Sequence, residues 1–291
     1  MGDRPSYAEQ RDLLCRFFLD THVAYDVADI QWPDLQPGTQ QFLAGLPIWD
    51  EAVNTEHETA VLVRAMADHE PDPVLAEAIA MQAFEEERHA TLVTALTGRY
   101  GIEVRRRPTP VVGDPVWAFL KSGWGETLDS FVAFGVFALA RDLALVPQEL
   151  LAVFDLVMQE EARHILFFES WRVLCRTARG GWPATRFAAA EGRTASLVVL
   201  ARLRLAASSP GRTSADNQNF LVSGIGALGD VTPRAFVDRC LAENDRRFAP
   251  YDSRLARPRI VPALARALRK ALPDRPVGSV AVDPQATTSF S

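Results

Sequence analysis

The sequence predicts an all-α protein built around a four-helix bundle, with additional helices before and after the bundle. Three observations predict this class. Apolar residues recur at spacings of three and four along most of the chain. Prolines and glycines divide its central part into two pairs of helices joined by a longer link. A Glu-Glu-x-Arg-His motif occurs twice, at Glu85–His89 and at Glu160–His164, 75 residues apart.

The expected bundle covers residues 47–179. Its first pair of helices is predicted over 47–68 and 73–97, with a turn that ends at Asp72-Pro73 between them. A connection over 101–115 leads to a short helical piece at 116–120 and to Gly123-Trp124-Gly125, where we expect a break. The second pair follows, the third helix ending near 145 and the fourth covering 147–179.

The segments that flank the bundle are also expected to be mainly helical. Residues 1–46 should form a helix over 5–20 and a loop with a short helix near 39–43, both packing on the bundle. Residues 180–272 form the additional C-terminal helices, predicted at about 184–208, 232–247 and 258–272, with a glycine-rich mixed segment at 217–230. The tail over 273–291 is expected to be disordered.

Composition excludes several classes of function. The chain has 291 residues, 48% of them hydrophobic, and a formal net charge of −6, which argues against a nucleic-acid surface. Its three cysteines lie far apart, so we expect neither a disulfide framework nor a Cys-x-x-Cys metal site, and a reducing cytoplasm is the natural compartment. No apolar run reaches the length of a membrane span, and the first residues lack the apolar stretch of a signal peptide.

The two motifs predict metal ligands. Each contains Glu-x-x-His, as Glu86 with His89 and Glu161 with His164, and residues three apart lie on the same face of a helix. Both glutamates occupy positions in the apolar row of their helix, where a buried carboxylate is very unfavourable unless it is paired or bound to a metal. Two copies at matched depth therefore favour a metal site over a solvated charged face.

Two further carboxylates are needed from the partner helices, and each has two candidates. In the first helix Glu56 lies on the apolar side, whereas Glu51 lies about 140° away at 100° per residue. The internal repeat favours Glu51, which aligns with Glu126. We favour Glu56, because the helical wheel shows directly which side chain faces the core. In the third helix we favour Glu126 and keep Asp129 as the alternative.

The residues next to the ligands are candidates for supporting them. A metal-bound histidine usually donates its second ring N–H to a carboxylate or a carbonyl group. Glu85 and Glu160 can accept this bond across the bundle, and Arg88 and Arg163 can neutralise them; the alternative is that all four are ordinary surface charges. His22, His57 and His69 have no such context, and we expect them to be exposed or structural.

These residues resemble the ligand pattern of the ferritin-like di-iron carboxylate superfamily. The pattern is carried by Glu56, Glu86-x-x-His89, Glu126 and Glu161-x-x-His164, and the fuller motifs are similar to those of bacterial multicomponent monooxygenase hydroxylases and ribonucleotide reductase small subunits. The resemblance covers about residues 47–179. No tyrosine stands beside the motifs in the sequence, where Phe167 and Phe168 occur instead, which argues against a tyrosyl-radical reductase.

The resemblance implies a non-haem di-iron oxygenase or oxidase that activates dioxygen to oxidise a small organic substrate. The implied cofactor is two iron ions, cycling between Fe²⁺ and Fe³⁺, with manganese or a mixed manganese–iron pair as the alternative. No catalytic group beyond the metal ligands is predicted. An apolar lining is expected near the site from six aromatic residues, with plain core packing as the alternative for most of them: Trp124, Phe131, Phe134, Phe137, Phe167 and Phe168.

The expected partners are the substrate, dioxygen and an external electron donor, because the sequence contains no reductase module. No nucleic-acid or membrane partner is expected, and a homodimer is compatible with the prediction. A competing function is iron handling, as a ferroxidase, an iron store or a peroxide scavenger. A third is a bundle with a structural metal or a partner-binding role, for which the basic helix from Arg257 to Lys270 is the candidate surface.

Overall fold

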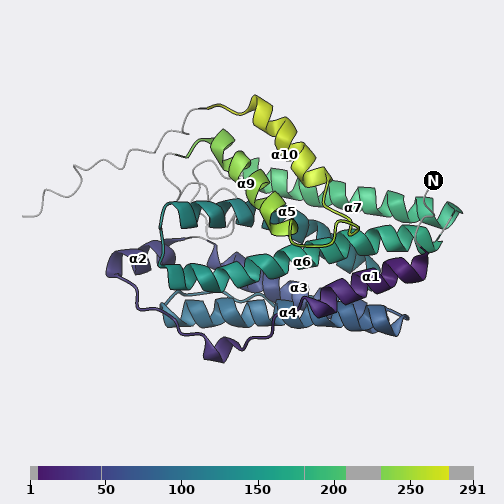
Figure 1. Cartoon of the computed structure of the whole chain (residues 1–291). Helices are drawn as coiled ribbons and strands as arrows, with labels where there is room; N and C mark the ends of the chain where they lie inside the picture. Colours follow the sequence, from purple (N-terminus) through teal and green to yellow (C-terminus); the bar gives the residue numbers. More distant parts are fainter. Residues whose placement is uncertain (1–5, 47, 180, 208–230, 275–291) are drawn as a thin grey trace, which may run out of the picture.

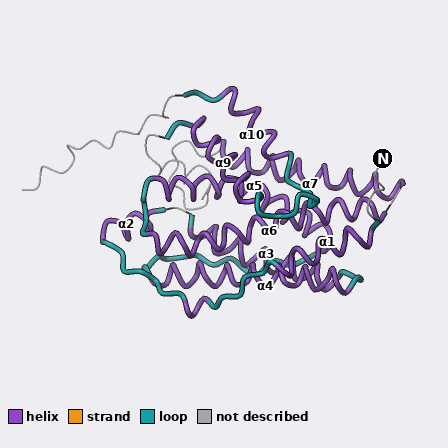
Figure 2. Tube along the Cα trace, in the orientation of Figure 1, coloured by secondary structure: helices purple, strands orange, loops and turns teal. Residues whose placement is uncertain are grey.

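A computed structural model describes residues 6–46, 48–179, 181–207 and 231–274. These residues form α-helices, one short 3-10 helix and connecting loops, and they contain no strand (Figure 2). The all-α class predicted from the sequence is confirmed. In the part of the chain that the structure describes, every helix is too short or too polar to cross a membrane.

Figure 1 colours the helices in their order along the chain, from purple at the N-terminus to yellow at the C-terminus. The N-terminal elements are α1 (Tyr7–Asp20), η1 (Val27–Asp29) and α2 (Pro37–Gly45). The central helices are α3 (Trp49–His69), α4 (Pro73–Arg99), α5 (Pro115–Asp142) and α6 (Gln148–Arg179). The C-terminal helices are α7 (Gly181–Ala207), α9 (Pro233–Phe248) and α10 (Ile260–Ala271).

The four central helices surround a common interior. Helix α3 packs against α4 and α5, and α6 packs against α5 and contacts α4, so each helix has two neighbours among the other three. The buried residues of α3, α4, α5 and α6 form a shared apolar core in which the two Glu-Glu-x-Arg-His motifs are enclosed. This arrangement brings the motifs of α4 and α6 to the same level.

The flanking helices cover two sides of this core. Helix α1 lies against α4 and α6, and α7 lies against α5 and α6 (Figure 1). Helix α9 packs along α5, and α10 packs on α9. The N-terminal segment therefore reaches α4 and α6, the helices that carry the motifs, whereas the C-terminal helices enclose α5.

Local sequence explains where several helices begin. Helices α4, α5 and α9 each start with proline, and the side chain of the preceding Asp72, Asp114 or Thr232 accepts hydrogen bonds from amides of the first turn. Proline fits this position because the first amide of a helix has no partner within the helix, and a capping oxygen satisfies the following ones.

The prediction of a break before the third helix was wrong. Helix α5 continues through Gly123 and Gly125 as one helix from Pro115 to Asp142. A Cβ atom at position 123 would lie 2.3 Å from the ring of Phe168, so Gly123 is required by the close approach of α5 and α6 and does not end the helix. The helix ends at Asp142, slightly before the predicted end at 145. Ala144, just beyond it, has a φ of 49°, which lies outside the helical region.

The remaining predicted helices differ from the observed ones by a few residues at their ends. The short helix near 39–43 is longer and covers Pro37–Gly45, and the predicted 258–272 helix begins at Ile260. The mixed segment at 217–230 and all but the first two residues of the predicted tail, 275–291, lie outside the described residues.

Candidate metal centre

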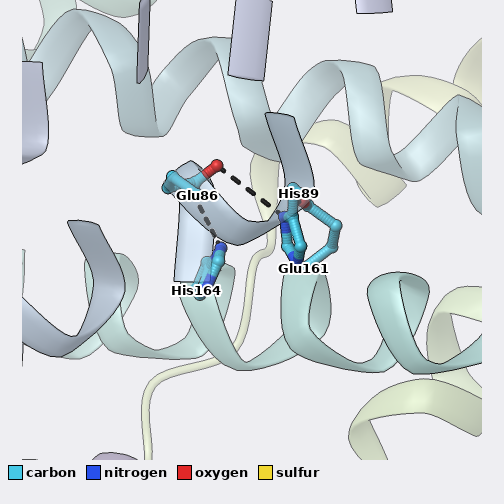
Figure 3. Close-up of side chains that lie close together, drawn as sticks. All are labelled: Glu86, His89, Glu161 and His164. Atoms are coloured by element: carbon cyan, nitrogen blue, oxygen red, sulfur yellow. Dashed lines mark ion pairs between the residues drawn. The ribbon is translucent and has the colours of Figure 1, made fainter. Parts of the chain in front are cut away.

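Four buried side chains from two helices converge in the core. Glu86 and His89 come from α4, and Glu161 and His164 come from α6 (Figure 3). Each offers one ligand atom, and these atoms all lie within 4.8 Å of one another. A metal ion needs this kind of arrangement, in which carboxylate oxygens and imidazole nitrogens point at one another from rigid helices.

Three buried atoms of the group have the surroundings expected of metal ligands. Glu86 Oε1 and His164 Nδ1 lie 2.8 Å apart, and His89 Nδ1 lies 3.2 Å from Glu161 Oε1. Even so, Glu86 Oε1, His89 Nδ1 and His164 Nδ1 are buried and lack a hydrogen-bond partner among the described residues. Buried polar atoms are nearly always satisfied, and a coordinated cation satisfies all three at once. The donor set therefore fits a metal ion.

The other ring nitrogen of each histidine is held by a carboxylate from the opposite helix. Glu85 Oε2 on α4 lies 2.8 Å from His164 Nε2 on α6, and Glu160 Oε2 on α6 lies 2.8 Å from His89 Nε2 on α4. Because these carboxylates accept, each Nε2 carries the proton and each Nδ1 keeps its lone pair for a metal. Glu85 and Glu160 thus each accept from the histidine of the opposite helix, which is the role expected for them from the sequence.

Two buried arginines hold these carboxylates in turn. Arg163 Nη1 donates to Glu85 Oε1 over 2.7 Å, and Arg88 Nη2 donates to Glu160 Oε1 over 2.5 Å. Each pair joins α4 to α6, and all four side chains are nearly inaccessible to solvent. Glu85, Arg88, Glu160 and Arg163 therefore lie in the interior, not on the surface.

Residues 18–25, which we call the N-terminal strap, complete both halves of this arrangement. Its backbone and Thr21 side chain accept from the two arginines: Arg163 donates to the carbonyl oxygen of Phe18 and to Thr21 Oγ1, and Arg88 donates to the carbonyl oxygens of Val23 and Tyr25. These bonds satisfy guanidinium groups that would otherwise be buried without partners.

Two strap side chains contact the supporting carboxylates directly. His22 Nδ1 lies 2.6 Å from Glu85 Oε1, and the Tyr25 hydroxyl donates to Glu160 Oε2 over 3.2 Å. The ring of Tyr25 also lies under the Arg88 guanidinium, 3.8 Å from its carbon atom. Each predicted ligand histidine is thus linked to the strap through one glutamate. The sequence pattern predicts no such role for His22 and shows no tyrosine beside the motifs.

In α3, Glu56 turns toward the site and Glu51 turns away. Glu56 Oε2 lies 3.5 Å from His89 Nδ1. Glu51 pairs with Arg107 of the connection before α5 and accepts from Thr55 Oγ1 over 3.2 Å. Five positions on a helix amount to about 140° of rotation, which is why one helix cannot aim both carboxylates inward.

In α5, Glu126 faces the site and Asp129 faces α7. Glu126 accepts from Gln82 Nε2 over 3.3 Å and from Ser122 Oγ over 3.0 Å. Asp129 instead accepts from Arg202 Nε over 2.9 Å in an ion pair with α7. Glu56 and Glu126 lie beside the four convergent residues, and Glu51 and Asp129 do not.

The buried charges shift the pKa values of the histidines. Burial alone would lower the pKa of His89, but the carboxylates of Glu160, Glu161 and Glu56 raise it well above its usual value. Burial likewise opposes protonation of His164, and the carboxylates of Glu86 and Glu85 raise its pKa. The carboxylates that raise these pKa values would equally stabilise a bound cation beside the two rings.

The pKa values of the buried carboxyl groups depend on the charges that lie next to them. Burial and the nearby charge of Glu161 raise the pKa of Glu126 to about 7. Burial also raises the pKa of Glu86 well above its usual range. For Glu85, burial is outweighed by His164 and Arg163, which lower its pKa. The supporting carboxylate thus stays ionised, while carboxyl groups facing the interior of the site repel one another.

The aromatic residues expected to line the site are mostly core residues. Phe131 packs between α5 and α9, and Phe134 lies 6.4 Å from Phe248 of α9, measured between ring centroids. The Phe137 ring lies under the Arg247 guanidinium of α9. Core packing, the alternative to a lining role, describes these three, because α9 covers this side of α5. Trp124 and Phe168 pack together between α5 and α6, and Phe167 lies against Phe18 of α1.

Several residues at the site escaped the sequence reasoning. Ser122 and Ser130 flank Glu126 by four residues on either side, and Ser130 Oγ donates to Glu161 Oε2 over 3.0 Å. A polar residue one turn before and one turn after a buried glutamate was a signal that could have found them. The sequence contained no comparable signal for the strap, because residues 18–25 are distant in sequence from both motifs.

Comparison of the chain with protein-family models, with curated proteins and with solved structures found no match. The observation that bears on what the chain binds is its own buried Glu/His group, which could hold a metal ion.

Proposed function

We propose that the chain is a ferritin-like di-iron protein that activates dioxygen to oxidise a small organic substrate. The observation that carries the proposal is the convergence of Glu86, His89, Glu161 and His164, with each histidine fixed by a glutamate of the opposite helix. Glu56 and Glu126 complete a proposed set of four carboxylates and two imidazoles. Four carboxylates balance two divalent cations, and this mixture of oxygen and nitrogen ligands suits iron or manganese.

The residues of the chain prepare the site for such a pair of ions. Glu85 and Glu160 keep the Nε2 protons of the histidines, so that both Nδ1 atoms face inward. Ser130 orients Glu161, and Gln82 and Ser122 hold Glu126. Burial of the whole group excludes bulk water and strengthens every electrostatic interaction within it. When bound, a pair of ferrous ions supplies electrons for the reduction of dioxygen.

The test is anaerobic loading with ferrous iron, followed by metal analysis and by oxygen uptake. We expect about two ions per chain, as in other bundles with duplicated Glu-x-x-His motifs. The variants Glu161→Ala and His164→Ala should lose metal. Glu87→Ala is the matched control, because Glu87 is an exposed residue that directly follows Glu86. Full metal content in Glu161→Ala would refute the proposed site.

The same experiment separates the oxygenase proposal from iron handling. An oxygenase should oxidise only its bound iron and then require an external electron donor for further oxygen uptake. A ferroxidase should continue to oxidise added ferrous iron without any donor or organic substrate. Continued turnover of this kind would replace the first proposal with the second.

A further inference from the structure

A second site is indicated at the opposite end of the chain, between the end of α9 and the start of α10. A cavity of about 460 Å³ lies there, next to the loop over 249–259. Its wall includes Asp245 and Phe248 of α9, the loop residues Arg257 and Arg259, and Pro262 and Arg266 of α10. This volume is in the range of sites that hold small ligands.

The walls of the cavity are held in place by contacts with the central helices. The buried ring of Phe248 packs edge-on against Phe134 of α5. In the loop, the backbone N–H of Ala256 donates to Ser170 Oγ of α6 over 3.0 Å, and the Tyr251 hydroxyl accepts from Gln159 Nε2 over 2.6 Å. The loop is therefore anchored to α6 at two points, which preorganises the cavity.

The arginines that line the cavity differ from the other arginines of the same segment. Six arginines of α9, α10 and the loop between them form ion pairs with carboxylates: Arg234, Arg239, Arg246, Arg247, Arg254 and Arg269. In the part of the chain that the structure describes, Arg257, Arg259 and Arg266 form no ion pair with a carboxylate, although the charge of Asp252 acts on Arg257 from beyond ion-pair distance. The three arginines of the segment that lack an ion pair all line one cavity.

Arg257 is fixed in a geometry that leaves one of its donors unused. Its Nη2 atom donates to the carbonyl oxygens of Phe248 and Tyr251, over 3.1 and 2.8 Å. Its Nη1 atom is buried and has no hydrogen-bond partner among the described residues. The Nη1 atom is closed off from the cavity, but the two bonds of Nη2 fix the guanidinium charge in the cavity wall, where it favours an anion.

The first turn of α10 adds to the positive potential. Arg259, the residue before the helix, provides no side-chain cap for its free amides. Arg259, Pro262 and Ala263 of this turn belong to the cavity wall, where the helix presents the positive end of its dipole. Among the described residues of the wall, three guanidinium groups stand against the single carboxylate of Asp245.

We propose that this cavity binds a phosphate group carried by a partly apolar molecule. Guanidinium groups match phosphate oxygens in geometry and charge, and Phe248, Pro258 and Pro262 supply an apolar surface beside them. The phosphate belongs either to a soluble phosphate ester or to an anionic lipid. The second source is considered because α10 exposes Ile260, Leu264 and Leu268 along one stripe, with exposed fractions of 48%, 53% and 56%. The site is independent of the proposed metal centre.

The test compares two double variants of the full chain that remove the same charge. Arg259→Gln/Arg266→Gln removes two exposed arginines of the cavity, and Arg239→Gln/Arg254→Gln removes two paired arginines outside it. Titration calorimetry with inorganic phosphate and with phenyl phosphate should show binding to the native protein. We expect binding to weaken by at least about tenfold in the cavity variant and to change little in the control. Thermal melting verifies that both variants are folded.

Vesicle sedimentation distinguishes the two sources of phosphate. Binding to phosphatidylglycerol vesicles, absent with phosphatidylcholine and lost in Leu264→Ser/Leu268→Ser and in the cavity variant, assigns the site to a lipid headgroup. Binding of the soluble phosphates alone assigns it to a phosphate ester. The proposal is overturned if neither probe binds, or if the cavity and control variants lose binding equally, since that result reflects net charge alone.

Discussion

His22 Nδ1 lies 2.6 Å from Glu85 Oε1, so the N-terminal strap contacts the carboxylate that supports His164. Tyr25 contacts Glu160, the carboxylate that supports His89, in the corresponding position. The two proposed ligand histidines are therefore positioned by three parts of the chain: their own helix, the opposite helix and the strap. We expect each layer to contribute to metal binding.

Removing a strap contact should weaken metal binding without abolishing it. In His22→Ala or Tyr25→Phe, one hydrogen bond to a supporting glutamate is lost, and we expect metal affinity to fall about two- to tenfold. Competition with a chelator measures the change. His57→Ala is the control, since the His57 side chain points to Thr109 of the connection before α5, with its Nε2 atom 3.5 Å from Thr109 Oγ1. Equal effects of His57→Ala and His22→Ala would show that the strap has no specific role.

Removing the supporting glutamates should have a larger effect. Glu85→Ala leaves His164 Nε2 without its acceptor and removes the ion pair of the buried Arg163. Loss of such a partner typically lowers metal affinity by about 10- to 100-fold. Glu87→Ala changes an exposed neighbour on the same helix and should bind metal normally. The prediction fails if Glu85→Ala and Glu87→Ala have the same dissociation constant.

The two candidates in α3 can be separated by metal content. Glu56→Ala removes the carboxylate beside His89 Nδ1 and should lower the number of metal ions bound per chain. Glu51→Ala breaks a partly exposed pair with Arg107, for which the expected cost in stability is about 0–1 kcal/mol, and should leave metal content unchanged. Elemental analysis of both variants after identical loading decides between them, and a loss confined to Glu51→Ala would reverse the assignment.

Metal binding should release protons, and its affinity should rise with pH. The pKa values of His89 and His164 are raised in the metal-free protein by the surrounding carboxylates. Metal must displace these protons, so affinity falls as pH decreases and levels off only above the raised pKa values. Calorimetry in buffers of different ionisation enthalpy measures the release. Binding at pH 7 with no proton release would contradict this account.

Two glycines of α5 should respond to alanine in opposite ways. A Cβ atom at Gly135 would lie 2.3 Å from Cys240 Sγ and 3.2 Å from its backbone nitrogen, so Gly135→Ala must push α9 away. We expect a loss of about 1–3 kcal/mol in the free energy of unfolding. Gly125 has no atom within 4 Å of its Cβ position, and Gly125→Ala should stabilise the helix by about 0.5–1 kcal/mol. Denaturant unfolding measures both, and equal shifts would refute the packing argument.

The buried ion pairs of Arg172, one within α6 and one to α7, should also matter for stability. Arg172 Nη1 donates to Glu169 over 2.6 Å, and its Nε atom bonds to the buried Glu191. Arg172→Met leaves two buried carboxylates without this partner, and we expect a loss of about 3–5 kcal/mol. Arg254→Gln, which breaks an exposed pair with Asp252, is the control and should change stability by less than about 1 kcal/mol.

The sequence determined the class of fold and the centre of the candidate site. Apolar spacing, together with proline and glycine positions, predicted helices close to those observed, because these signals act within a few residues. Glu86, His89, Glu161 and His164 could be found for the same reason: residues three apart must share a helix face. The helical wheel also pointed Glu56 toward the interior, since rotation about a helix axis is local geometry.

Only the tertiary structure decided what surrounds these residues. The strap reaches Glu85 and Glu160 across more than 60 residues of sequence, and no local periodicity records such a contact. In the sequence, Gly123 suggests a break in the helix, whereas in the structure it allows the close approach of Phe168. Phe131 suggests a lining residue, whereas in the structure α9 covers it. Periodicity specifies which face of a helix is apolar, whereas packing between distant segments specifies what that face meets.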